Sequence, residues 1–152
     1  MRSTYRVFAY IIAAEVVLQA AMMAFAVAGL FTWIDKDGGM LDKAVLESEP
    51  DFTGAVGFMI HGMNGMMLIP LLALIFLIIS FFAKIPQGVR WAVIVLVCTF
   101  VQIALGTLSR LLAPIGALHG AVALVLFGVA VMAAMRAQKP AAVEEPVPAA
   151  MA

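Results

Sequence analysis

The stretch that decides the fold runs from Phe52 to Ala83 and reads FTGAVGFMIHGMNGMMLIPLLALIFLIISFFA. It has 32 residues and contains no Asp, Glu, Lys or Arg. The hydrocarbon core of a bilayer, about 30 Å thick, is crossed by roughly 20 apolar residues of helix. Since hydrocarbon offers no hydrogen-bond partner to a backbone amide, an α-helix is the conformation expected there. The stretch therefore predicts a membrane-spanning helix.

Three more stretches of the chain have the same character. Residues 7–34 hold a single charged side chain, that of Glu15, and residues 91–109 and 111–135 hold none. We therefore predict an all-α fold, a four-helix bundle of up-down-up-down topology that occupies residues 1–136. The expected transmembrane helices cover about residues 7–33, 57–82, 91–110 and 114–135.

The composition of the whole chain agrees with a membrane protein. Of the 152 residues, 65% are apolar and 12% are charged, and the mean hydropathy is +1.11. A soluble domain is about half apolar and one quarter charged. Nine basic residues balance nine acidic ones, which argues against a nucleic-acid partner. One cysteine, Cys98, leaves no partner for a disulfide within the chain.

The distribution of basic residues predicts the orientation in the membrane. The side richer in Lys and Arg faces the cytoplasm. With four spans both termini share a side, which holds six of the nine basic residues: Arg2, Arg6, Lys84, Arg90, Arg136 and Lys139. We expect a multi-pass protein of the cell membrane with both termini cytoplasmic. The acidic segment of about 34–56 is then an outer loop, and the Ala/Pro/Glu-rich tail, 137–152, is expected to be disordered.

The chain has two histidines, His61 and His119, and they are the strongest candidates for a cofactor site. Each lies near the start of a span that runs from outside to inside, so both are expected about one turn below the outer surface. The second and fourth helices are parallel in this topology and can lie diagonally across the bundle. Two imidazoles at one depth are suited to bind both faces of one heme iron. Two interfacial histidines without a ligand are the alternative.

Small and polar residues accompany the histidines on their helix faces. Gly54, Gly57 and Gly65 share a face with His61, and Gly116 and Gly120 share one with His119. They leave room for a macrocycle, or they permit close helix packing. Two polar side chains lie near the expected site: Arg110, which could pair with a heme propionate or extend to the interface, and Asn64, which could orient His61 or bond to another helix.

A third set of polar residues predicts a proton site. Glu15 and Gln19 are one turn apart on the first span, and Gln102 lies in a polar stripe of the third. Acids inside a membrane often belong to proton paths. We expect Glu15 in the cytoplasmic half, away from the histidines. There it would be protonated, or paired with Gln102 or with a basic residue at the inner surface.

Two families resemble this chain. Gln102-Ile103-Ala104-Leu105-Gly106 and Leu118-His119-Gly120, with a histidine at the start of the second span, resemble one half of heme A synthase, which consists of two four-helix repeats with histidine ligands on the second and fourth helix of each. The chain is also similar to small four-helix integral membrane proteins without an assigned activity, which share Ala28-Gly29-Leu30-Phe31, His61 and Leu118-His119. The resemblance implies a heme b site at His61 and His119 and, by analogy, pairing of two copies. Heme A synthase has a glutamate and an arginine where this chain has Phe58 and Gly62, so its reaction is not carried over.

The sequence thus favours a cytochrome b-like membrane protein that binds one heme b for electron transfer or as a respiratory or heme-handling accessory. Its expected partners are the lipid bilayer and a quinol or a respiratory membrane protein. A Cu(I)-handling protein is an alternative, because thioether and imidazole ligands suit Cu(I) and cluster here: Met59, His61, Met63, Met66 and Met67. A cofactor-free assembly subunit is another.

A proton-coupled small exporter is the last alternative. Ala14-Glu15-Val16 in the first span and Ile85-Pro86-Gln87-Gly88 after the second are similar to segments of small multidrug-resistance exporters. The sizeable acidic loop before the second span differs from the short loops of those proteins.

Overall fold

The computed structural model describes residues 1–48 and 51–138, and this part of the chain is helical throughout, with no strand. The elements follow one another as α1 (Arg2–Lys36), α2 (Lys43–Glu47), α3 (Ala55–Met63), the π-helix η1 (Asn64–Leu68), α4 (Ile69–Phe82), α5 (Gly88–Leu108) and α6 (Ala113–Arg136). Because α3, η1 and α4 form one uninterrupted rod, four long helices result. Each of the four is long and apolar enough to cross a membrane, which indicates a multi-pass membrane protein.

Three of the long helices begin and end within three residues of the predicted spans, but α1 differs. It begins at Arg2, five residues before the predicted start, and continues to Lys36. The prediction ended the span at the charged residues. Arginine and lysine are good helix formers, so a charge marks the edge of an apolar run and not the end of the helix.

The segment predicted as an outer loop, 34–56, contains the short helix α2. Asp42 precedes α2, and its side chain accepts a hydrogen bond from the Val45 amide at 2.8 Å, which is N-terminal capping. The predicted disordered tail lies outside the described residues from position 139 onward.

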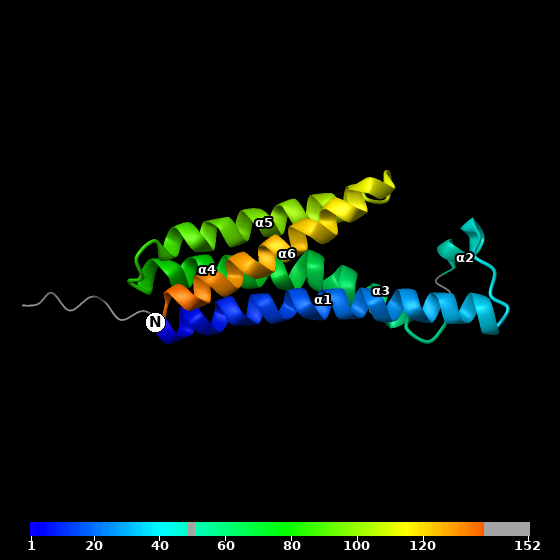
Figure 1. Cartoon of the computed structure of the whole chain (residues 1–152), viewed down its shortest axis with the longest axis horizontal. Coiled ribbons are helices and arrows are strands. Elements are labelled where there is room, and N and C mark those ends of the chain that lie inside the picture. Colours follow the sequence, from blue (N-terminus) through cyan, green and yellow to red (C-terminus); the bar gives the residue numbers. More distant parts are fainter. Residues whose placement is uncertain (49–50, 139–152) are drawn as a thin grey trace, which may run out of the picture.

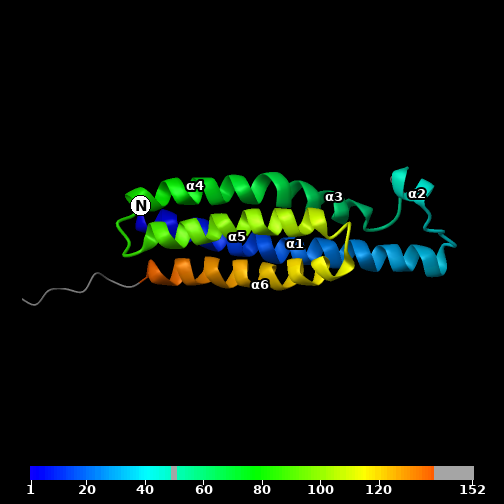
Figure 2. The same cartoon turned by 90° about the horizontal axis from the view of Figure 1, so that it is seen from above.

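The four long helices form a ring. Both α1 and α5 pack against α4 and α6, so α4 and α6 occupy opposite corners. Figure 2 shows α4 along one side of the molecule and α6 along the other, with α1 and α5 between them. The N-terminus, the α4–α5 turn and the last turn of α6 lie at one end (Figure 1).

The buried core is concentrated at that same end. Tyr5, Ile12, Phe76 and Val95 are fully buried there, and the Tyr5 hydroxyl donates a hydrogen bond to the Gly88 carbonyl at 3.0 Å. Residues 100–125, all of them described, include none that is buried. In Figure 1, α5 and α6 diverge from α1 and α3 toward this second end. The bundle is therefore tightly packed at one end and open at the other.

The α1–α3 pair depends on three glycines that allow close contact. A Cβ at Gly29 would collide with the Thr53 carbonyl, and a Cβ at Gly57 would collide with the Met22 carbonyl. A Cβ at Gly54 would lie 2.8 Å from the Phe25 carbonyl, and its φ of +103° is one that few other residues adopt. Of the two roles considered for Gly54 and Gly57, close helix packing is the one the structure shows.

We expect Gly57→Ala to destabilise the protein, because the added methyl group forces α1 and α3 apart. Overpacking of this kind costs about 1–3 kcal/mol in the free energy of unfolding. Thermal unfolding of the detergent-solubilised protein measures the change. Gly128→Ala is the matched control, since no atom lies within 4 Å of a Cβ placed there. Equal melting temperatures for the two variants would contradict the assigned role of Gly57.

Candidate functional site

The rings of His61 and His119 come together in the bundle. His61 belongs to α3 and His119 to α6, and their ring centroids are 6.1 Å apart with 66° between the ring planes. Both side chains are partly buried. From the sequence we expect the two histidines at one depth on diagonal helices. In the structure their imidazole groups are neighbours across the four-helix bundle.

Each histidine is held by a backbone carbonyl of another helix. The Nδ1 atom of His61 is 3.1 Å from the Gln19 carbonyl oxygen on α1, and Nδ1 of His119 is 3.1 Å from the Gln102 carbonyl oxygen on α5. In the orientation of the Gln19 side chain that its neighbours require, Nδ1 of His61 also accepts from the Gln19 amide nitrogen at 2.7 Å, so its two contacts require opposite tautomers. A carbonyl oxygen only accepts, and we therefore assign the proton of the neutral His119 imidazole to Nδ1. This tautomer leaves the lone pair of Nε2 available, as in most histidines that bind a metal.

The two halves of the site repeat one arrangement. In each half, the backbone carbonyl of a glutamine on one helix lies 3.1 Å from Nδ1 of the histidine on the next spanning helix. The sequence carries the repeat as Ile60-His61-Gly62 and Leu118-His119-Gly120, each with a glutamine in the preceding span. The sequence analysis named these residues but missed the repeat, because its signal is only one His-Gly pair and one glutamine in each half.

The Gln19 side chain has a second role beside its carbonyl. In the orientation that its neighbours require, its amide nitrogen donates to the His61 carbonyl at 2.9 Å and to His61 Nδ1 at 2.7 Å, and its oxygen accepts from the Gly65 amide at 3.1 Å. Gln19 is buried. It therefore joins α1 to the chain directly after His61, where the α-helix changes to the π-helix η1.

The π-helix has a local cause in the sequence. Pro70 cannot donate a backbone hydrogen bond, and in a regular α-helix its ring would clash with the carbonyl four residues earlier, that of Met66. The wider turn of η1, Asn64–Leu68, directly precedes α4 and relieves this clash. The sequence analysis did not predict η1, since a proline in an apolar run equally predicts a kink.

Glu15 lies close to the histidine site, and the expectation that it lies away from the histidines is wrong. Its Oε2 accepts a hydrogen bond from Asn64 Nδ2 at 3.3 Å, and Asn64 is three residues after His61. Because α1 begins at Arg2, Glu15 is 13 residues into the chain from that point, or about 20 Å along the axis at 1.5 Å per residue. The expected pairing of Glu15 with Gln102 is replaced by this bond to Asn64.

The glycines near the histidines differ in their surroundings. A Cβ at Gly106 would lie 3.1 Å from His119 Cε1 and 3.3 Å from Nδ1, so this glycine allows His119 to lie directly against α5. The sequence analysis had placed Gly106 only in a polar stripe. Cβ atoms at Gly65 and Gly116 would meet only ordinary contacts, and one at Gly120 would meet none within 4 Å.

Gln102 and Arg110 are the two remaining candidates. The Oε1 atom of Gln102 is buried without a hydrogen bond, and a buried unpaired acceptor requires an explanation. Arg110 is exposed just after α5, at the open end of the bundle.

The methionines near His61 do not converge on it. Met59, Met63, Met66 and Met67 are each more than half exposed on the outside of the rod, whereas His61 is turned toward His119. No group of three or more His, Cys, Asp or Glu side chains gathers within residues 1–48 and 51–138. The described polar groups that meet at the site are therefore two imidazoles, one carboxyl group, the side-chain amides of Gln19 and Asn64, and the backbone carbonyls of Gln19 and Gln102.

The chain matches no protein-family model, no curated protein and no solved structure in the comparisons made with them.

We expect Gln19→Leu to destabilise the protein by about 1–3 kcal/mol, because the His61 carbonyl and the Gly65 amide lose their partner in a buried place. Thermal unfolding in detergent measures the loss. Gln138→Leu, which removes an exposed glutamine bonded to Tyr10, is the control and should change the melting temperature little. A Gln19→Leu variant as stable as the wild type would contradict the bridging role.

Proposed function

We propose that this protein is a membrane cytochrome that binds one heme b between His61 and His119 and transfers single electrons. The observation that carries the proposal is the pair of imidazoles, each held through Nδ1 by a backbone carbonyl of a neighbouring helix. Backbone carbonyls at this position are the usual second-shell partners of metal-binding histidines. Because Nδ1 is engaged, Nε2 is the ring nitrogen that is left to bind a metal.

The spacing of the two rings supports the proposal. A bond between a metal ion and an imidazole nitrogen is about 2.0–2.1 Å long, and that nitrogen is about 1.1 Å from its ring centroid, so two imidazoles on opposite sides of one ion have centroids roughly 6.2 Å apart. The measured separation is 6.1 Å. The angle of 66° between the planes is acceptable, since each ring turns about its own bond to the metal.

The surroundings of the histidines also fit a flat ligand. Space near Gly120 is open, and Gly106 lets His119 lie against α5. The unpaired Oε1 of Gln102 can accept from a ligand or from water at the site. At the open end, Arg110 carries the charge that would pair with a propionate.

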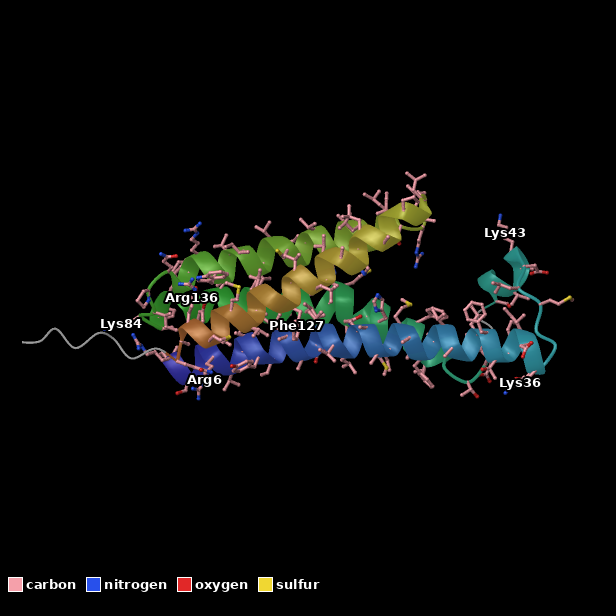
Figure 3. All side chains as sticks on the ribbon, in the orientation of Figure 1. Arg6, Lys36, Lys43, Lys84, Phe127 and Arg136 are labelled. Carbon is pink, nitrogen blue, oxygen red and sulfur yellow. The ribbon has the colours of Figure 1, made fainter. Side chains whose placement is uncertain are left out.

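The proposed arrangement in the membrane is up-down-up-down with both termini in the cytoplasm. Arg6, Lys84 and Arg136 extend at one end of the bundle, whereas Lys36 and Lys43 extend at the other (Figure 3). By the positive-inside rule the first of these ends faces the cytoplasm. His119 is six residues from the start of α6, or about 9 Å at 1.5 Å per residue, which puts the proposed heme near the outer surface.

Two axial histidines leave no open position on the iron, and such a heme supplies a one-electron couple and no oxygen chemistry. The residues of this chain would bind and orient the group and exclude water from it. We accordingly propose a quinol or a respiratory membrane protein as the exchange partner. The likeness to one four-helix unit of heme A synthase supports the heme ligands, and we propose no heme oxidation.

The test of the proposed ligands is an absorption spectrum of the detergent-solubilised protein, oxidised and then reduced. We expect the Soret and α bands of a heme b in the wild type and their loss in His61→Ala and His119→Ala, because each variant removes one axial ligand. Leu124→Ala, on the exposed side of the same helix as His119, is the matched control and should keep the bands. A wild type without heme from heme-replete cells would overturn the proposal, and metal analysis would then distinguish a copper-handling protein from a cofactor-free subunit.

The proposed orientation is tested with single cysteines in a Cys98→Ser background. We expect a membrane-impermeant maleimide added to intact cells to label Asp37→Cys, beyond the outer end of α1, and not Ser3→Cys. Both positions are exposed, so accessibility from each side of the membrane decides the result. The opposite labelling pattern would reverse the orientation.

A further inference from the structure

We infer that Glu15 is a proton-accepting group coupled to the oxidation state of the proposed heme. The inference rests on the proposed function and adds a role that heme ligation does not need. It begins from placement: Gln19, one turn after Glu15, holds His61, and Asn64, one turn after His61, donates to Glu15 at 3.3 Å. The carboxyl group and the proposed iron ligand therefore lie about one helical turn apart along two adjacent helices, and each is hydrogen-bonded to a polar residue of the other helix.

Glu15 is also the one acidic or basic residue between Val7 and Ile34, so its charge has no partner of opposite sign on its own helix within the span. Elements packed against α1 are α3, α4 and α6. Their titratable groups are His61 on α3 and His119 and Arg136 on α6, while α4 has none. Nδ1 of each histidine contacts a backbone carbonyl, and Arg136 lies at the far end of α6 over the Trp91 ring.

A carboxyl group in this place responds to the charge of the iron. In an apolar interior, opposite charges attract strongly over several ångströms. The carboxylate form of Glu15 is favoured beside ferric iron, which has one more positive charge than ferrous iron. Glu15 would take up one proton from the surrounding water, forming one O–H bond, as a quinol delivers one electron to the proposed heme. Charge and atoms balance, because one electron and one proton enter together.

Asn64 suits this role better than a basic residue would. Its amide donates to Glu15 without carrying a charge, so the carboxyl group can change its protonation state and retain the contact. A lysine or arginine there would hold Glu15 as a permanent carboxylate. The pairing of an acid with a neutral amide is thus consistent with a group that exchanges protons.

The experiment is a redox titration of the purified heme protein at several pH values. Reduction with proton uptake lowers the midpoint potential as pH rises, by up to about 59 mV for each tenfold fall in proton concentration in a one-electron couple. We expect this slope in the wild type and a flat line in Glu15→Gln. Asp35→Asn removes an exposed carboxylate from the outer end of the same helix and should keep the wild-type slope.

A slope that persists in Glu15→Gln, or that is absent from the wild type, would overturn the inference and leave the heme proposal intact, since the bands are still present. Absence of heme from the wild type would end both. If Glu15→Gln does not fold, the infrared difference spectrum of the wild type, reduced minus oxidised, tests the inference instead. We expect the C=O band of a protonated carboxyl group to appear on reduction, with the isotope shift of labelled glutamate, and its absence would equally overturn the inference.

Discussion

The site depends on one contact made twice, that of histidine Nδ1 with a glutamine backbone carbonyl on a neighbouring helix. A main-chain carbonyl is a demanding partner, because α1 and α5 must lie at a fixed height and rotation relative to α3 and α6. Gly106 meets this demand on one side by allowing His119 to lie against α5. On the other side the Gln19 amide and the π-helix after His61 meet it. The packing of the helices therefore also determines the orientation of the two imidazole rings.

The architecture could be predicted from the sequence because it follows from the free energy of transferring apolar residues from water into a bilayer. Long apolar stretches in a chain that is 65% apolar have few alternatives to helices that cross a bilayer, and the four long helices lie where those stretches are. The misplaced start of α1 shows the limit of this reasoning. Hydropathy indicates which residues lie in the hydrocarbon of the bilayer. The helix itself extends further, through Arg2 and Arg6, because its backbone hydrogen bonds continue there. The place expected for Glu15 was counted from the predicted start of α1, and the bond to Asn64 instead puts Glu15 beside the histidine site.

The candidate site was predictable in part, and the division has a physical reason. Two histidines and Glu15 are conspicuous in this apolar chain because an ionisable group inside a membrane costs free energy. The contacts that hold these side chains in place could not be recognised in the sequence. The carbonyl of Gln19 is a property of the backbone that every residue has, and the bond from Asn64 to Glu15 depends on how α1 is rotated against η1. Gly57 showed the opposite problem, since a glycine beside a histidine predicts a ligand or close packing equally well, and here it packs against Met22.

The uneven packing of the bundle has a kinetic consequence. At the end that contains Tyr5 and Phe76, separating the two helical hairpins would expose the buried core, whereas between residues 100 and 125 no side chain is buried. Opening costs less free energy where fewer buried contacts are lost. Breathing motions should therefore concentrate at the open end, with the tight end as a hinge. A bulky planar molecule can then exchange sideways from the lipid while the rest of the protein keeps its native contacts.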